Sequence, residues 1–269
     1  MAMTLQDMTS IASLTRNLAS KAYTSGNTGT TGAAATSGTS DILTQALDTA
    51  SKRISTQVSQ TDVQLSSYGQ IKSGFASLQT TGKALTTLAK DATASDISKA
   101  AQNFVNAYNS TTSAVSTAVN GSGNTAGALA NDQLARLASN DLRRVVTSST
   151  GSSALQNIGI SVGQNGSLSI DAKALEKALQ ANPDAVKSTL SKLGQQANTS
   201  ATQELSSGGA VGSAVNTLNS RAKNLAAAQS QQQGLAASAQ LAIQQASDQT
   251  TSFGGFSAGI AAYMKMFSL

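Results

Sequence analysis

The stretch from Leu155 to Val186 carries the densest set of local structural signals in the chain. Two alternations of apolar with small or polar residues predict two half-buried strands. The apolar residues of these strands are Ile158, Ile160, Val162, Leu168 and Ile170. Between them, residues 163–166 read Gly-Gln-Asn-Gly, and Asn-Gly favours a hairpin turn because both residues tolerate positive φ. The sequence therefore predicts a β-hairpin here.

Two helices are predicted directly after the hairpin. Asp171 is suited to N-cap a helix that runs through Leu175 and Leu179. Asn182 followed by Pro183 predicts a second helix start, because proline is favoured at the first helical position. Residues 155–186 are therefore expected to form a compact strand–turn–strand–helix–helix module.

The rest of the chain favours long helices. Pro183 is the only proline among 269 residues, and proline is a strong helix breaker. From Asp41, which we expect to cap the first long helix, apolar residues recur in steps of three, four and seven, as in a heptad seam with a stutter. The seam contains Leu43, Leu47, Ile54, Val58, Leu65, Tyr68, Ile71, Phe75 and Leu78. It suits a helix packed inside its own domain as well as an intermolecular coiled coil.

Further helices are predicted at residues 97–119, at about 131–146 with Asn131 or Asp132 as cap, and from Val211 to about Ala246. Because only 39% of the residues are hydrophobic and 3% aromatic, thin Ala/Leu seams fit better than a thick core. The expected fold class is mainly α: a long antiparallel helical bundle or coiled coil with a small β-hairpin-containing module.

The two ends differ in composition from this helical core. Residues 4–23 have the spacing of an amphipathic helix, and residues 24–40 indicate a flexible linker rich in Gly, Ser and Thr. Residues 248–269 hold four of the nine aromatic residues. This tail is expected to bury against the N-terminal helix or between subunits, with a membrane-active tail as a weaker alternative. The chain thus divides into 1–40, 41–247 and 248–269.

The residue types on which most catalytic and metal chemistry depends are missing. The chain has no Cys and no His, which excludes disulfides and Cys/His metal sites and removes the commonest general base. Glu176 and Glu204 are the only glutamates and form no paired-carboxylate motif, and residues 121–127 lack the Gly-Lys-Ser/Thr ending of a P-loop. We expect no enzymatic activity, no cofactor and no metal.

The net charge of +5 leaves open a basic helical protein that binds nucleic acid or an anionic membrane. Against this, the basic residues are mostly scattered and lack interleaved aromatic residues, so we expect no nucleic-acid partner. No run of about 18 apolar residues exists, so stable membrane insertion is not expected. The first residues also lack the basic and apolar regions of a cleaved signal peptide.

Several blocks resemble the bacterial flagellar filament-capping protein family, also called hook-associated protein 2. Residues 40–47 and 58–79 resemble its N-terminal helix, and Phe-Val-Asn-Ala-Tyr-Asn at 104–109 is similar to the Phe-Val-x-x-Tyr-Asn that opens its C-terminal region. Residues 129–134 resemble a further block. Residues 155–186 are similar to three more in the family's order: Leu-x-x-Ile-Gly-Ile, Gly-x-Leu-x-Ile/Leu-Asp and Ala-Leu-x-x-Asn-Pro-Asp-Ala-Val.

The resemblance implies an exported, extracellular axial protein of the flagellum that acts as a homo-oligomer at the filament tip and helps flagellin assemble. Its implied partners are flagellin or other axial proteins and an export chaperone. The large β-rich outer domains of the family have no counterpart in residues 83–103, so this would be a minimal form. A chain of the same ancestry that itself polymerises into a filament or junction is the alternative.

In either case, the contacts that hold the assembly together are expected on the helical seams and in the aromatic tail. The candidate contact residues are Leu47, Ile54, Val58, Leu65, Leu218, Leu225, Ile243, Phe253, Phe256, Tyr263 and Phe267.

Overall fold

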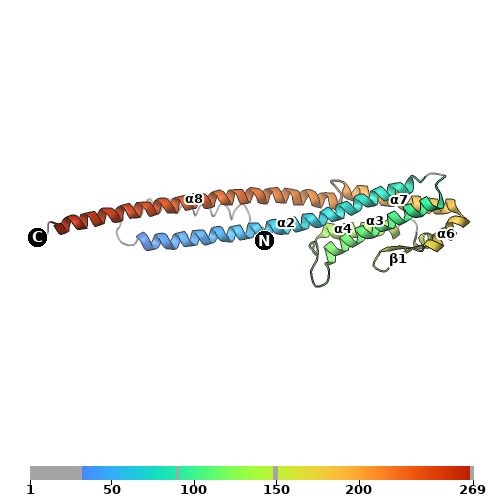
Figure 1. The fold of residues 1–269 in the computed structure, drawn as a ribbon, viewed down its shortest axis with the longest axis horizontal. Helices are drawn as coiled ribbons and strands as arrows, with labels where there is room; N and C mark the ends of the chain where they lie inside the picture. The colour runs from blue at the N-terminus through green and yellow to red at the C-terminus, as the bar shows by residue number, and fades with distance from the viewer. Residues whose placement is uncertain (1–31, 89–90, 148–150, 267–269) are drawn as a thin grey trace. The chain divides into compact units, whose positions relative to one another are not determined.

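The computed structural model describes residues 32–88, 91–147 and 151–266 (Figure 1). In chain order these residues form α2 (Gly32–Thr86), α3 (Ala94–Asn120), α4 (Gln133–Thr147), α5 (Gly151–Asn157), β1 (Ile160–Val162), β2 (Leu168–Ile170), α6 (Ala172–Ala181), α7 (Pro183–Leu205) and α8 (Ala210–Met266). The protein is mainly α-helical with a small antiparallel hairpin, which confirms the predicted fold class.

The described residues divide into two compact units. The first, called the helical-pair unit, contains residues 32–59 of α2 and residues 223–266 of α8. The second, called the core unit, contains the described residues from 60 to 222. Residues 40 and 247, where the sequence predicts domain boundaries, both lie inside continuous helices, and that division stays a prediction.

Both long helices extend further than predicted. α2 begins at Gly32, so the prediction that Asp41 caps it is wrong, and residues 32–40 of the predicted linker are helical. α8 continues past Ala246 to Met266. Neither extension contains proline, and an existing helix adds residues far more easily than it nucleates, even where Gly, Ser and Thr have modest propensity. The predicted helix at 4–23 lies outside the described residues.

The shorter helices begin where their capping residues predict. Asp171 caps α6 by accepting the Lys173 N–H at 3.0 Å, and Asn182 caps α7 by accepting the Ala185 N–H at 3.0 Å. Of the two candidates for α4, Asp132 supplies the cap through its carboxylate, which accepts two backbone N–H groups of the first turn. Each of these caps satisfies donors that the helix itself leaves free.

The predicted hairpin is present, and its turn lies at the predicted residues 163–166, with Gln164 and Asn165 at the centre of the turn and Gly166 after them. β1 pairs antiparallel with β2, the Gly163 N–H donates to the Ser167 carbonyl at 2.7 Å, and Gly166 has a φ of 80°. The strand is shorter than the alternation suggested, because Ile158 lies in a turn before β1. The helix α5, which precedes that turn, was not predicted.

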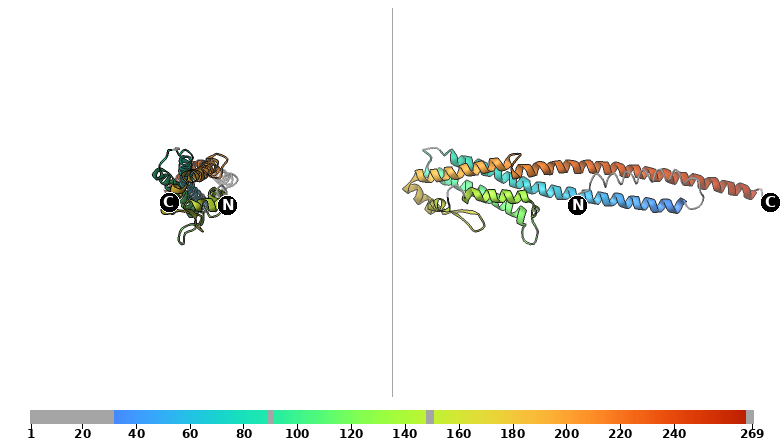
Figure 2. Two further views of the ribbon diagram at one scale, coloured as in Figure 1. Left: turned by 90° about the vertical axis from the view of Figure 1, so that its right-hand side faces the viewer. Right: turned by 180° about the vertical axis from the view of Figure 1, so that it is seen from behind.

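The core unit buries the apolar faces of α2, α3, α4 and α7, which lie alongside one another in Figures 1 and 2. The rings of Phe104 and Tyr108 stack with their centroids 6.5 Å apart. The largest fully buried side chains are Tyr68, Tyr108, Phe75, Phe104, Ile71, Leu78, Leu85, Ile97, Leu129, Leu142, Leu155 and Ile160. The second half of the heptad seam is therefore interior to the chain's own domain.

Two glycines allow the backbones of α2 and α7 to touch. A Cβ on Gly82 would lie 2.9 Å from the carbonyl oxygen of Gly194, and a Cβ on Gly194 would overlap the Gly82 carbonyl. Close by on the same two helices, the Gln79 side-chain amide donates to the Thr202 hydroxyl at 2.7 Å. This crossing fixes α7 against α2 at a distance that only glycine permits.

Candidate assembly surfaces

The helical-pair unit consists of α2 and α8 lying side by side and antiparallel (Figures 1 and 2). The Gln232 amide, only 8% exposed, donates to the Leu47 carbonyl oxygen at 2.6 Å across the pair. Its buried side chains, where described, are Ala50, Ile54, Leu225, Gln232 and Ala239. Where its side chains are described, at residues 44–59, 223–241 and 244, the seam buries few large apolar side chains.

Six of the predicted contact residues have described side chains, and all six are buried or half-buried within the chain. Ile54, Leu218 and Leu225 are buried, while Leu47, Val58 and Leu65 are half-buried. The seam residues thus face other parts of the same chain. Their participation in contacts between chains stays a prediction.

The aromatic tail contributes a continuation of α8. Ile243, Phe253, Phe256 and Tyr263 occupy positions in this helix, and Phe267 lies outside the described residues. Within the helical-pair unit, α8 continues beyond the first described residue of α2 (Figure 1). The predicted contacts of the tail also stay a prediction.

Asn109 of α3 attaches the hairpin to the helical core. Its Nδ2 donates to the Leu168 carbonyl oxygen and its Oδ1 accepts the Leu168 N–H, both at 2.8 Å. The side-chain amide thereby replaces a neighbouring strand at the outer edge of β2. Sequence reasoning missed this role, although Asn109 ends the Phe-Val-Asn-Ala-Tyr-Asn block that carried the resemblance.

Glu204 is a second residue whose role was missed. It lies near the end of α7, is 3% exposed, and accepts the Val211 N–H of α8 at 3.3 Å. Burial, followed by the neighbouring Asp141 carboxyl group of α4, raises the pKa of Glu204 to about 7. The Tyr68 hydroxyl is also buried, and burial, followed by the neighbouring Asp132 carboxyl group, raises the pKa of this phenol. Both groups lie inside the helical core, where Glu204 connects α7 to α8.

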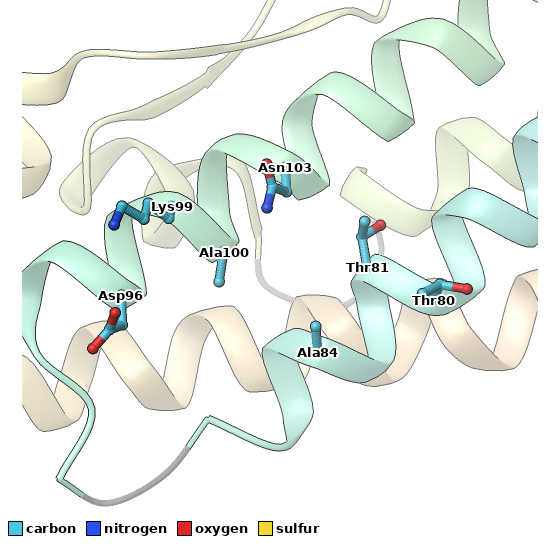
Figure 3. A pocket seen from close by; sticks show the side chains of 7 residues that line it. All are labelled: Thr80, Thr81, Ala84, Asp96, Lys99, Ala100 and Asn103. Carbon is cyan, nitrogen blue, oxygen red and sulfur yellow. The ribbon is translucent and has the colours of Figure 1, made fainter.

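An open groove of about 380 Å³ lies between the end of α2 and the start of α3 (Figure 3). Its lining is formed by Thr80, Thr81, Ala84, Asp96, Lys99, Ala100 and Asn103. Asp96 already serves the capping box of α3 with Thr93, and hydrogen bonds from Thr93 lower the pKa of its carboxyl group. The groove offers no buried charged group to bind or activate a substrate.

Other kinds of site receive no support in the part of the chain that the structure describes. No group of three or more acidic side chains there could hold a metal ion. Likewise, none of the described helices combines the length and apolar character needed to cross a membrane. The features that stand out are helical faces and the contacts that position them.

The family model for the C-terminus of flagellar hook-associated protein 2 matches residues 77–252. The chain belongs to this family. The match covers the blocks at 104–109, 129–134 and 155–186, so the resemblance stated from the sequence is confirmed. It spans most of the core unit and continues into α8. Hook-associated protein 2 is a structural component of the bacterial flagellum, and the mainly helical fold of this chain agrees with membership of its family. A search of curated proteins found no match to the chain.

Proposed function

We propose that this chain is an exported structural component of the flagellum that caps the filament tip as a homo-oligomer and assists the assembly of flagellin. The observation that carries the proposal is the family match over the folded helical core. The chain would act without catalysis, by presenting helical surfaces at the tip. Flagellin, other axial proteins and an export chaperone are the proposed partners.

The core unit and the helical-pair unit are suited to different roles in the proposed cap. The core unit has a continuous buried interior with well-defined caps, so it is suited to hold a fixed shape. The helical-pair unit has a thin seam with a buried glutamine, so it gains stability when other helices cover it. In the proposed cap, the pair docks among filament subunits, and rearrangement of these contacts admits the next flagellin.

Deletion of the gene tests this function. Without the protein, we expect short or missing filaments and monomeric flagellin in the medium, and the wild-type gene should restore both. Filaments of normal length with no secreted monomeric flagellin would contradict the proposal. The variant Ile54→Asp, which places a charge at a 3% exposed position of the pair, should fail to restore capping, whereas the neighbouring exposed Ser55→Asp should succeed.

A self-polymerising filament or junction subunit is the second candidate. The long antiparallel pair of α2 and α8, whose thin seam calls for further packing, is the observation that favours it. Electron microscopy of the purified protein distinguishes the two functions, because closed small rings support the cap and open fibres support the polymer.

A further inference from the structure

Two large apolar side chains are exposed in the described part of the core unit, and they lie on different helices. Val63 on α2 is 55% exposed and Leu137 on α4 is 45% exposed. Single exposed apolar residues are common on protein surfaces, so exposure alone indicates little. The residues that surround Val63 and Leu137 indicate that both side chains belong to contact surfaces.

The exposed face of α4 is basic around its leucine. Arg136, Leu137, Asn140 and Arg143 recur at helical spacing on this exposed side and are called the Leu137 face. Among the described residues, Arg144 pairs with Asp141 at 3.1 Å, while neither Arg136 nor Arg143 pairs with a carboxylate. The Arg136 guanidinium donates one hydrogen bond to the Ala130 carbonyl oxygen at 2.7 Å, and its other N–H groups can bind a carboxylate of another chain, as can the guanidinium group of Arg143.

The exposed face of α2 has the opposite charge and small side chains around its valine. Asp62, Val63, Ser66 and Gly69 recur at helical spacing on this exposed side and are called the Val63 face. No ion pair involves Asp62 in the described structure. The face therefore offers one carboxylate, one exposed valine and otherwise small side chains, and the exposed Lys72 lies one turn beyond Gly69.

Gly69 supports contact with another molecule. A glycine inside an exposed helix costs about 1 kcal/mol relative to alanine. Gly74 and Gly82 of the same helix have an internal reason, since a Cβ on either would lie about 3 Å from atoms of a neighbouring helix. A Cβ on Gly69 would meet nothing within 4 Å. The space over Gly69, roughly 9 Å along the helix axis from Val63, is thus open, and a side chain from another chain can approach the α2 backbone there.

We propose that the protein assembles through a contact in which the Leu137 face of one copy packs on the Val63 face of the next copy. The apolar residues meet at the centre, and Arg136 and Arg143 lie beside Asp62. Two Leu137 faces would repel each other through their arginines, so the contact is heterologous. A heterologous contact repeats from copy to copy and closes into a ring or continues as a fibre. The inference rests on the proposed function only in taking the protein to be a homo-oligomer.

Disulfide cross-linking tests the contact directly, because the chain has no native cysteine. We expect a mixture of the single variants Val63→Cys and Leu137→Cys to form disulfide-linked dimers on mild oxidation, while either variant alone forms few. The mixture of Val63→Cys with Asn106→Cys, an exposed position on α3, is the matched control. Equal cross-linking in the two mixtures, or efficient cross-linking of either variant with itself, would overturn the proposal.

Charge reversal gives an independent test in the full-length protein by sedimentation. Arg136→Asp and Asp62→Arg should each weaken self-association about tenfold, and the double variant should recover most of the loss. Lys177→Asp, an exposed charge on α6 that belongs to neither face, should have little effect. No recovery in the double variant overturns the proposal. The proposal is also overturned if Arg136→Asp binds a DNA column less well than wild type but self-associates normally, because the arginines would then bind nucleic acid.

The outcome for the interface can be separated from that for the cap. If the wild-type gene restores capping but the Val63→Cys and Leu137→Cys mixture does not cross-link above its control, the interface is wrong and the function stands. If the mixture cross-links and the double variant Arg136→Asp with Asp62→Arg recovers self-association, but filaments grow normally without the gene, the interface stands and the proposed function is wrong.

Discussion

At the scale of single residues, two polar side chains connect parts of the core unit that are distant in sequence. Asn109 binds both backbone groups of Leu168, 59 residues away, and Glu204 binds the Val211 N–H at the start of α8. Neither position is predictable from local pattern, because an asparagine or glutamate on a helix is ordinarily a solvated residue. Only the fold brings their partners within reach.

The Asn109 contact should contribute measurably to stability. We expect Asn109→Ala to lower the free energy of unfolding by roughly 1–3 kcal/mol, because it removes two hydrogen bonds and leaves the Leu168 backbone groups without partners. Urea unfolding of the full chain measures the change. Asn106→Ala, which removes an exposed contact with Gln102 one turn away, should cost less than about 0.5 kcal/mol. Similar losses in both variants would show that Asn109 does not hold the hairpin.

Glu204 should make stability depend on pH. Its pKa of about 7 in the folded protein exceeds its ordinary value of 4.5, so the folded state holds a proton that the unfolded state releases. This contribution is fully present below pH 4.5 and is lost as the pH rises toward 7, by up to about 3 kcal/mol. Asp141 faces Glu204 from α4 and adds to the effect, while the Val211 N–H opposes it.

Replacement of Glu204 by glutamine should remove this dependence. Glu204→Gln should be more stable than wild type at pH 8 and should lose much less stability between pH 5 and pH 8, as measured by urea unfolding at each pH. Glu176→Gln, an exposed glutamate on α6, is the control and should follow the wild-type profile. A wild-type profile for Glu204→Gln as well would mean that Glu204 ionises normally in the folded protein.

At the scale of the elements, the sequence predicted best what depends on near neighbours. The caps at Asp171 and Asn182 and the turn at Gly166 follow from a few adjacent residues, and all three are present. The start of α2 and the end of α8 lie beyond their predicted positions, because Gly- and Ser-rich composition does not end a helix where no proline or competing cap enforces a break. For the assembly surfaces, the sequence predicts only which helices carry apolar seams. Which exposed helical faces lie near one another depends on tertiary packing, which the sequence pattern does not give.

The crossing of α2 and α7 gives an element-scale prediction. Gly194→Ala should destabilise the core unit by about 1–3 kcal/mol, since its Cβ would overlap the Gly82 carbonyl and force the helices apart. Gly69→Ala is the matched change on α2, where a Cβ meets nothing within 4 Å, and it should stabilise the helix by up to about 1 kcal/mol. Thermal or urea unfolding compares the two. Equal and favourable effects would show that the α2–α7 contact tolerates separation.

At the scale of the whole molecule, the two units are built for different levels of stability. The core unit carries the large aromatic and aliphatic side chains, including Tyr68, Phe75 and Phe104. The helical-pair unit relies on residues such as Ile54 and Leu225, with Gln232 in the seam. A buried polar residue in a helical seam fixes register at a cost in stability. Local opening should therefore concentrate in the pair.

Hydrogen exchange on the unassembled protein measures this difference. Amides in residues 44–59 and 223–241 should exchange faster than those in α3, α4 and α7, because fewer apolar contacts oppose their opening. Gln232→Leu should slow exchange in the pair by removing the cost of the buried amide, while leaving the core unit unchanged. In assembled protein, the pair should become protected as neighbouring helices cover it. Uniform protection of both units before assembly would instead mean that the pair is complete without partners, and that docking at the filament tip adds little to its stability.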